Sequence, residues 1–585
     1  MSTAAADLLQ RLETLVRQES GYQREHLERQ WSLPLGERVR RGYALEGLSY
    51  VGVSEHTGNL VFKCMANNAR FREGDYLFLH KSHPLLEPII EVTLEVDDEQ
   101  RLEFSLGRGN LVRIWDEPHD WIADEGYMDL IGYYLNALAE VADRHVGRER
   151  ILPLLLDEIG PQLDFSAYER GWSAATEVGL NESQAEALGQ AYSTDLAYLI
   201  QGPPGTGKTL VLAHLVRLLA EEGERVLVTA LTHRAIHNAL DKVAKVAPDL
   251  PVCKIGPGAR ADGLAVDNFE TFTQSQFEKI PAGYVIGATP FATRTERLSK
   301  VEFDTIVFDE ASQITLPLAI MGMLAGKRYI FIGDDRQLPP VIPYRQEDLP
   351  LARTSIFGFL AGRGYETMLT DTYRMNDALT AWPSRTFYGN RLRPAPGIGE
   401  RRLQLAPVDD LWQPILDPAH PAVFVDLAGS NTTVRSHREA DIIVDLVMTL
   451  LRAGIDPLEI GVIAPYRAQG REIRNRLRRD INDRNARREL IIDTVERMQG
   501  QEREVILFSM TTASPSFAAD LASFFFQEQR LNVTITRPRT KLIIVGSSAV
   551  LNAQPDAPEQ QAAVALFRDL LQQCTLRFAP YGEGS

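Results

Sequence analysis

The spacing of hydrophobic residues changes several times along the N-terminal third of the chain. A leucine stripe over residues 8–15, with charges around it, predicts a helix from residue 1 to about 30. From about 47 to 115, short apolar runs separated by turn residues predict a small barrel of short strands. Helical spacing returns from about 124 to 160. We therefore predict that residues 1–170 form a small β-barrel carried on helices.

After Gln184 the pattern changes to an alternation of predicted strands and helices. One series of apolar runs ends near residue 334, and a second begins near residue 420. Strands that alternate with helices predict a parallel sheet with crossover helices. We expect an α/β protein with two sheet domains, residues 171–345 and 346–585, that meet in the proline-rich stretch 338–350.

The first sheet domain carries a glycine-rich turn between a predicted strand and a predicted helix. GPPGTGKT at 202–209 matches the P-loop pattern, in which backbone amides surround a β-phosphate and the helix N-terminus adds a positive end. Lys208 would reach the β- and γ-phosphate oxygens, and Thr209 would offer a hydroxyl to Mg²⁺. A turn that only joins two elements is the alternative. The predicted ATP-contacting residues here are Gly202, Pro203, Pro204, Gly205, Thr206, Gly207, Lys208, Thr209 and Leu210.

A pair of acidic residues ends a later apolar strand, TIVFDEAS at 305–312. Adjacent carboxylates at the end of a strand can serve two roles in phosphoryl transfer. Asp309 is the predicted magnesium ligand, and Glu310 is the predicted base that orients the attacking water. An acidic pair that caps the next helix is the alternative reading.

The next strand ends in GDDRQLPP at 333–340, and with this motif the chain resembles the superfamily 1 helicases. Further blocks follow in that family's order: LNESQAEAL (180–188), VTALTHRAIHNAL (228–240), IGATP (286–290), TYRMND (372–377), IGVIAPYRAQ (460–469), DTVERMQGQEREVI (493–506) and QRLNVTITRPRTKLIIVG (529–546). The blocks are similar to those of subgroup B, the nonsense-mediated-decay helicase and its relatives. The resemblance implies two RecA-like domains after an accessory barrel on helical stalks, ATP and Mg²⁺ as cofactors, and 5′-to-3′ movement on a single strand.

The resemblance also implies catalytic roles for three residues outside the P-loop. Gln337 would bond the γ-phosphate and report its loss. Arg374 and Arg537, from the second domain, would act as arginine fingers that reach the phosphate only when the cleft closes. A surface ion pair is the alternative for either arginine.

Three further residues are implied to hold the nucleoside. Gln184 would read the adenine, Tyr373 would stack on it, and Glu502 would bond the ribose.

Hydroxyl, amide and backbone groups in the same blocks are candidates for holding a strand without reading its sequence. Each could instead be an ordinary cap or turn residue. The arginine-rich stretch 467–488 contains interleaved acidic residues, which favours a solvated, ion-paired helix face over a nucleic-acid patch. The nucleic-acid candidates are Thr232, His233, Thr289, Pro465, Tyr466, Thr494 and Gln499.

The sequence departs from the family pattern at a few positions. His233 stands where the family usually has Asn, and His237 stands where it has Asp. Pro538 follows Arg537 directly and restricts the backbone of that arginine, so its approach to the phosphate is in question.

Composition limits the surface charge and the cellular compartment that we expect for this protein. The net charge is -17, from 62 Lys and Arg against 79 Asp and Glu. This balance argues against a uniformly basic coat for nucleic acid, but it allows a cleft that is locally positive. The three cysteines are too far apart for a metal knuckle or disulfide framework and fit a reducing compartment. Without a signal-peptide pattern or an apolar run long enough for a membrane, we expect a cytoplasmic monomer.

The leading hypothesis is a helicase or translocase on single-stranded DNA or RNA, with DNA slightly favoured because the chain lacks RNA-surveillance appendages. A non-unwinding ATPase that remodels nucleoprotein would use the same motifs. A regulatory protein that uses ATP as a conformational switch is the third hypothesis, and an intact Glu310 with both candidate arginine fingers argues against it.

Overall fold

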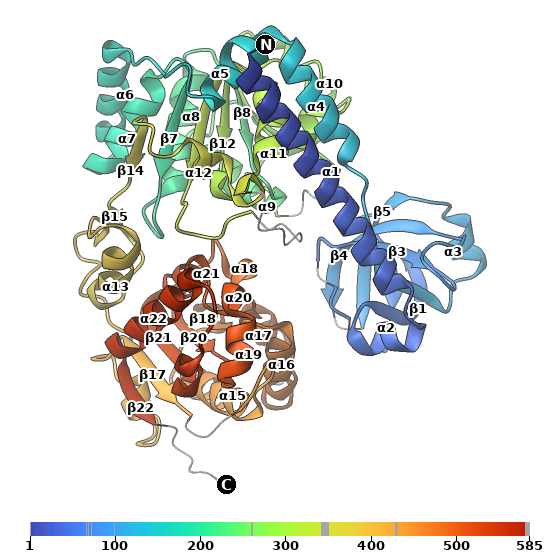
Figure 1. The fold of residues 1–585 in the computed structure, drawn as a ribbon, viewed down its shortest axis with the longest axis vertical. Coiled ribbons are helices and arrows are strands. Elements are labelled where there is room, and N and C mark those ends of the chain that lie inside the picture. Colours follow the sequence, from blue (N-terminus) through green and yellow to red (C-terminus); the bar gives the residue numbers. More distant parts are fainter. Residues whose placement is uncertain are drawn as a thin grey trace.

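The computed structural model describes residues 2–578 except 56, 66, 68, 72, 99, 259–260, 262, 341–349, 428–430 and 482. A small barrel and two sheet domains make up the molecule, and a long helix runs from the first sheet domain to the barrel (Figure 1). The predicted α/β fold with an N-terminal barrel on helices is confirmed. In the described part of the chain, no helix combines the length and the apolar character needed to cross a membrane.

Helix α1 (Thr3–Trp31) is the stalk that connects the barrel with the first sheet domain. The Ser2 hydroxyl caps its first turn by accepting a hydrogen bond from the Ala5 amide at 3.2 Å. Leu8 and Leu12 are buried in one core with α4 (Ile131–Asp143) and the first sheet domain. At the other end, the Trp31 indole donates to the Glu125 carbonyl of the barrel at 3.1 Å. The helix is therefore anchored at both ends.

The barrel closes in the strand order β1-β2-β5-β4-β3-β6, and its neighbouring strands are antiparallel. Alternate side chains point inward and fill the interior, among them Phe62, Phe104 and Trp121. Beneath it, the buried Arg38 of α2 (Leu35–Arg41) donates to Asp124 at 2.9 Å. The strands are β1 (Ala44–Val53), β2 (Leu60–Lys63), β3 (Tyr76–His80), β4 (Ile90–Asp98), β5 (Arg101–Arg108) and β6 (Trp121–Glu125), with α3 (Val112–Asp116) between the last two.

The first sheet domain has eight parallel strands in the order β10-β9-β11-β8-β12-β13-β7-β14. All carboxyl ends therefore lie at one edge, where loops can gather ligand-binding groups. The strands are β7 (Ala197–Gln201), β8 (Arg225–Thr229), β9 (Val252–Ile255), β10 (Asp267–Phe269), β11 (Tyr284–Gly287), β12 (Thr305–Phe308), β13 (Arg328–Gly333) and β14 (Glu366–Met368). Its further helices are α5 (Leu152–Leu155), α6 (Phe165–Glu177), α7 (Glu182–Ser193), α8 (Lys208–Glu221), α9 (His233–Val246), α10 (Phe272–Ser275), α11 (Leu316–Met323) and α12 (Ile356–Leu360).

The second sheet domain has six parallel strands in the order β19-β18-β20-β21-β17-β22. The strands are β17 (Ala422–Asp426), β18 (Ile460–Ile463), β19 (Ile491–Asp493), β20 (Arg503–Ser509), β21 (Pro538–Gly546) and β22 (Thr575–Phe578). Its helices are α13 (Asp377–Phe387), α14 (Gln413–Leu416), α15 (His437–Arg452), α16 (Arg467–Asp480), α17 (Arg484–Glu489), α18 (Val495–Met498), α19 (Pro515–Asp520), α20 (Ala522–Phe525), α21 (Glu528–Ile535) and α22 (Pro558–Gln573), and β15 (Asp371–Thr372) pairs with β16 (Arg393–Pro394) beside α13.

The boundary that we predict at 345/346 lies outside the described residues. After it, α12 still packs in the first core through Phe357 and Leu360, and β14 pairs with β7 as the last strand of the first sheet. We therefore place the crossing into the second domain after Met368, because a strand belongs to the sheet that satisfies its backbone hydrogen bonds.

Glu439, in the first turn of α15, is a buried carboxyl group in the second domain. It is 1% exposed and accepts hydrogen bonds from the Ser509 hydroxyl and the Thr511 amide, both at 2.7 Å. Burial raises the pKa of Glu439 from its usual 4.5 to about 7, although these hydrogen bonds oppose the rise. The group thereby ties the loop after β20 to α15.

Replacement of Glu439 by Gln should change how the free energy of unfolding depends on pH. Between about pH 4.5 and pH 7 the native state holds a proton that the unfolded chain has released, so this group makes stability fall as pH rises, by at most about 3 kcal/mol. Glu439→Gln should therefore be less destabilising, relative to wild type, at pH 8 than at pH 4.5. Urea unfolding at both pH values measures the difference, and an equal effect at both would show that Glu439 ionises normally.

Candidate functional site

The P-loop lies between β7 and α8, as the sequence predicts. Gly205 and Gly207 have φ of +76° and +83°, and Lys208 begins the helix. Gly205 also admits a close neighbour, because a Cβ there would lie 2.6 Å from the Thr372 hydroxyl and 2.5 Å from the Arg374 Cβ. Glycine is therefore required for two reasons: the positive φ of the turn, and the close approach of the segment that enters the second domain.

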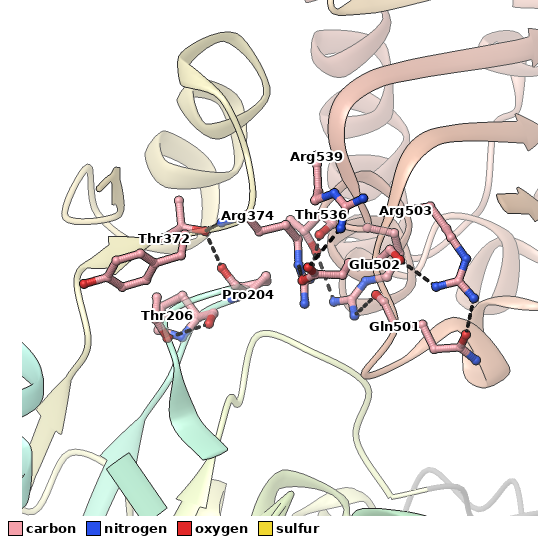
Figure 2. A network of polar contacts seen from close by, with 12 residues as sticks. Pro204, Thr206, Thr372, Arg374, Gln501, Glu502, Arg503, Thr536 and Arg539 are labelled. Atoms are coloured by element: carbon pink, nitrogen blue, oxygen red, sulfur yellow. Dashed lines mark hydrogen bonds and ion pairs between the residues drawn. The ribbon is translucent and has the colours of Figure 1, made fainter. Parts of the chain in front are cut away.

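Two hydrogen bonds join the P-loop to that entering segment. The Thr372 hydroxyl donates to the Pro204 carbonyl at 2.8 Å (Figure 2). The Tyr373 amide donates to the Gly205 carbonyl, also at 2.8 Å. Tyr373 is 44% exposed, and its hydroxyl accepts a hydrogen bond from Asn181 at 2.9 Å. The residue lines the same cavity as the phosphate-binding loop, where an aromatic ring could stack on a base.

Gln184 holds the P-loop from the side of α7. Its amide nitrogen donates to the Thr206 carbonyl at 2.9 Å, and its amide oxygen accepts from the Asn181 backbone at 3.0 Å. The side chain is 2% exposed. In this arrangement Gln184 supports the loop, and contact with an adenine would require it to exchange one of these bonds.

Asp309 and Glu310 follow β12 at the carboxyl edge of the first sheet. Glu310 has a left-handed φ of +50°, an uncommon conformation for a residue with a side chain and one that is concentrated at functional sites. Burial raises the pKa of Asp309 to about 7, the adjacent Glu310 adds to the rise, and Lys208 opposes it. The site therefore pairs two crowded carboxylates with one lysine of the P-loop.

Arg537 crosses from the second domain to the first. It is 1% exposed and donates to the Gln337 side chain of the first domain at 3.2 Å and to the Gln501 carbonyl at 3.1 Å. Burial lowers the pKa of Arg537 to about 9, and the nearby Arg374 lowers it further. Pro538 begins β21 and does not prevent this approach.

Arg374 lies between the P-loop and the second domain, where it forms an ion pair with Glu502 (Figure 2). Its Nε donates to the Glu502 carboxylate at 2.7 Å, and its Nη1 donates to the Thr536 carbonyl at 2.8 Å. A second arginine, Arg539, lies 3.7 Å from the other oxygen of Glu502. The sequence assigns Glu502 to a ribose, whereas here it is the counter-ion of the candidate arginine finger.

These residues surround one cavity of about 570 Å³ between the two sheet domains. The cavity has a size typical of small-molecule sites. It brings together predicted residues from both domains, namely Gln184, Pro204, Gly205, Thr206, Gly207, Lys208, Thr209, Leu210, Glu310, Gln337, Tyr373, Arg374, Glu502 and Arg537. Of the predicted nucleotide-site residues, Gly202, Pro203 and Asp309 are not part of its lining.

Several residues of the site have no role assigned from the sequence. Asn238 and Lys242 line the cavity from one face of α9, since they are one turn apart. Tyr388 and Asn532 reach across the cleft: the Tyr388 hydroxyl donates to Asp334 at 2.8 Å, and the Asn532 amide donates to the Arg336 carbonyl at 2.8 Å. The four-residue spacing of Asn238 and Lys242 could have predicted that they share one face of a helix. The residues next to Tyr388 in the sequence give no indication that it reaches the cleft.

The candidates for binding a nucleic-acid strand lie at the carboxyl edges of both sheets. They are in loops that follow β8, β11, β18 and β19, and because the β-strands are parallel, these loops lie on one side of each sheet. Thr232 caps α9, Thr289 precedes a short turn of helix, and Gln499 approaches Glu310 at 3.5 Å. Pro465 and Thr494 are buried, so their side chains have less surface for contact with a nucleic-acid strand than we expect. His233 and Tyr466 are partly exposed.

The magnesium candidates have suitable donor chemistry. A hydroxyl from Thr209 and a carboxylate from Asp309 are both hard oxygen donors. Burial first, and the charge of Glu310 second, raise the pKa of Asp309, and a cation would favour its charged form. In the described residues no group of three or more His, Cys, Asp or Glu side chains is arranged to hold a metal ion.

Comparison with known proteins agrees with the motifs. Two domain families match, both described as an AAA domain, one over residues 184–343 and the other over 352–549. The DNA replication ATP-dependent helicase/nuclease DNA2 of Saccharomyces cerevisiae is 27% identical over 443 residues, which cover 70% of this chain and 28% of the relative. The Mus musculus protein of the same name is 26% identical over 569 residues, which cover 86% of this chain and 52% of the relative.

Among solved structures, the crystal structure of Arterivirus nonstructural protein 10 (helicase) is 14% identical with a TM-score of 0.40, and covers 88% of this chain and 80% of that chain. By its motifs and its matching domains, this chain is a superfamily 1 helicase of the type that includes the nonsense-mediated-decay helicase and DNA2. It spans about half or less of the length of the two DNA2 relatives.

Gly205→Ala should destabilise the closed contact between the P-loop and the segment 372–374. The new methyl group would meet Thr372 and Arg374, and overpacking of this kind costs about 1–3 kcal/mol. Gly223→Ala is the matched control, because Gly223 has a φ of +94° but no atom within 4 Å of an added Cβ. Urea unfolding should show a larger loss for Gly205→Ala, and equal losses would mean that only backbone strain matters.

Proposed function

We propose that this protein hydrolyses ATP and uses the energy to move along single-stranded nucleic acid. The observation that carries the proposal is the cavity between the two domains, in which Arg537 of the second domain bonds Gln337 of the first. A nucleotide in this cavity would contact both domains at once. Its binding and loss can therefore change their separation, which is the requirement for a motor.

The residues divide the chemistry of hydrolysis among them. The P-loop amides and Lys208 would bind the phosphates, and Glu310 would orient the attacking water. Mg²⁺, when held by Thr209 and Asp309, would supply positive charge next to the phosphates. Arg537 and Arg374 would stabilise the charge that develops on the γ-phosphate.

The Arg374–Glu502 ion pair supports coupling between the nucleotide and the second domain. In this structure the Glu502 carboxylate holds the guanidinium group at 2.7 Å. A triphosphate in the cavity would compete with that carboxylate for the same guanidinium group. Movement of Arg374 from Glu502 to the phosphate would release the loop between α18 and β20, which contains the nucleic-acid candidate Gln499.

A single nucleic-acid strand would lie across the carboxyl edges of the two sheets. The protein would move along it from 5′ to 3′, as the family resemblance implies. DNA is favoured as the track, because the relatives named above are described as DNA replication helicases. The proposal covers the helicase part of those names only.

Steady-state ATP hydrolysis without polymer, with single-stranded DNA and with single-stranded RNA tests the proposal. Hydrolysis should rise strongly with one polymer, and more with DNA than with RNA. No stimulation by either polymer would contradict a motor and favour a protein that uses ATP only as a switch.

Lys208→Ala should abolish hydrolysis with little effect on folding, because it removes the phosphate-binding cation and leaves the buried core unchanged. Glu310→Gln should lower the rate by at least about a hundredfold while ATP still binds, since general-base catalysis contributes about 10²–10⁴-fold. A fluorescent ATP analogue measures binding separately from turnover. Glu13→Gln, on the exposed side of the stalk, is the control. Near-normal turnover in Lys208→Ala would show that the site lies elsewhere.

A further inference from the structure

A short loop after β13 carries Gln337 into contact with the second sheet domain. The loop begins at Asp334, whose carbonyl accepts a hydrogen bond from the backbone amide of Gln337 at 3.0 Å and so closes a turn. The next residue, Leu338, is 6% exposed and packs in a hydrophobic core of the second domain. The loop therefore belongs to the first domain by its backbone and is anchored in the second domain by an apolar side chain.

The side-chain amide of Gln337 is bonded at both ends. Its Nε2 donates to the Asp334 carboxylate at 2.7 Å, and its Oε1 accepts from Nη2 of Arg537 at 3.2 Å. A carboxylate can only accept hydrogen bonds and a guanidinium group can only donate them, so these two partners permit one orientation of the amide. If the two ends were exchanged, both hydrogen bonds would be lost.

Tyr388 of the second domain holds the carboxylate that sets this orientation. It caps the end of α13, and its hydroxyl donates at 2.8 Å to the same oxygen of Asp334 that accepts from Gln337. Burial raises the pKa of Tyr388 well above its usual value of 10, so the hydroxyl stays protonated and remains a donor near neutral pH. Helix α21 lies on the side of the second domain that faces the first (Figure 1), and its Asn532 donates to the tyrosine oxygen at 2.8 Å.

These contacts form a relay of hydrogen bonds that ends at a candidate arginine finger. The relay runs through Tyr388, Asp334, Gln337 and Arg537, and each of the four residues is at most 4% exposed. Hydrogen bonds in such a buried site are strong, and water cannot readily replace a lost partner. Loss of the Tyr388 hydroxyl would therefore disturb the amide that bonds the guanidinium group of Arg537.

We propose that Tyr388 is a positioning residue for ATP hydrolysis. Its hydroxyl fixes the Asp334 carboxylate, and that carboxylate orients the side-chain amide of Gln337. The amide in turn holds Arg537 at the cavity that both residues line. Because Tyr388 and Asp334 belong to different domains, the relay is complete only when the cleft is closed. This inference rests on the proposed function, since it requires that the cavity hydrolyses ATP.

Steady-state ATP hydrolysis by Tyr388→Phe tests the inference, because this change removes the hydroxyl and keeps the ring that packs in the second domain. The kcat should fall about tenfold with little change in the KM for ATP, since a small misplacement of a group that acts in the transition state can cost up to about a hundredfold. Tyr329→Phe is the matched control and should keep the wild-type kcat. Its buried hydroxyl donates to the Gly326 carbonyl at 3.0 Å, at the opposite end of β13 from the loop.

A second background separates positioning from a general structural effect. In Gln337→Ala the relay is already broken, so the further change Tyr388→Phe should alter kcat by less than about twofold, whereas independent effects would multiply. Binding of a fluorescent ADP together with aluminium fluoride, which mimics the phosphoryl group in transfer, gives the same comparison when turnover is too slow to measure. Tyr388→Phe should weaken this complex about tenfold and leave the binding of ADP alone unchanged.

Thermal unfolding measures whether each variant folds. Asn532→Ala, which removes the donor to the Tyr388 oxygen, is the second variant and should show the same pattern with a smaller loss of kcat. A normal kcat in Tyr388→Phe, or a full loss that persists in the Gln337→Ala background, overturns the inference, while hydrolysis by wild type leaves the proposed function intact. Failure of wild type to hydrolyse ATP overturns both.

Discussion

The guanidinium group of Arg537 lies at the junction of the two sheet domains, in a residue that is 1% exposed. It donates to one amide side chain of the first domain and otherwise to hydroxyl and carbonyl oxygens of its own domain. Such bonds to dipoles replace the lost hydration of a buried charge incompletely, although the nearby carboxylates of Glu310 and Glu502 also favour the charged form. A phosphate group in the cavity would give Arg537 a direct ionic partner.

The other contacts across the cleft follow from this constraint. Glu502 partly compensates for the positive charge by pairing with Arg374, and Asp334 accepts hydrogen bonds from Gln337 and from Tyr388 of the second domain. The bonds from Tyr388 to Asp334 and from Arg537 to Gln337 are directional contacts between the two domains, and separation of the domains would break them. In the motor that we propose, the nucleotide would select between discrete arrangements of the two domains.

The barrel is held by a different kind of contact. Helix α1 is packed into the first domain by Leu8 and Leu12 and reaches the barrel through Trp31, so apolar burial carries the barrel on the first domain. Its described polar contacts with the second domain are made by arginines: Arg467 and Arg497 donate to barrel carbonyls, and Arg488 pairs with Asp98 of β4 at 3.4 Å. Apolar packing on one side and polar contact on the other would let the barrel follow the first domain while the second moves beneath it.

The sequence alone determined the features that depend on neighbouring residues. The P-loop between β7 and α8, the acidic pair after β12, the parallel alternation and the short strands of the barrel all arise from local spacing, and the structure contains each of them. Tertiary structure decided which distant groups meet. Glu502 pairs with Arg374 across 128 residues, Arg467 reaches Arg70 across 397, and β14 joins the first sheet although it follows the predicted boundary. Periodicity shows which face of an element is polar, but only packing decides what that face meets. The same arginine-rich helix therefore pairs Arg476 with Glu472 on one side and meets the barrel through Arg467 on the other.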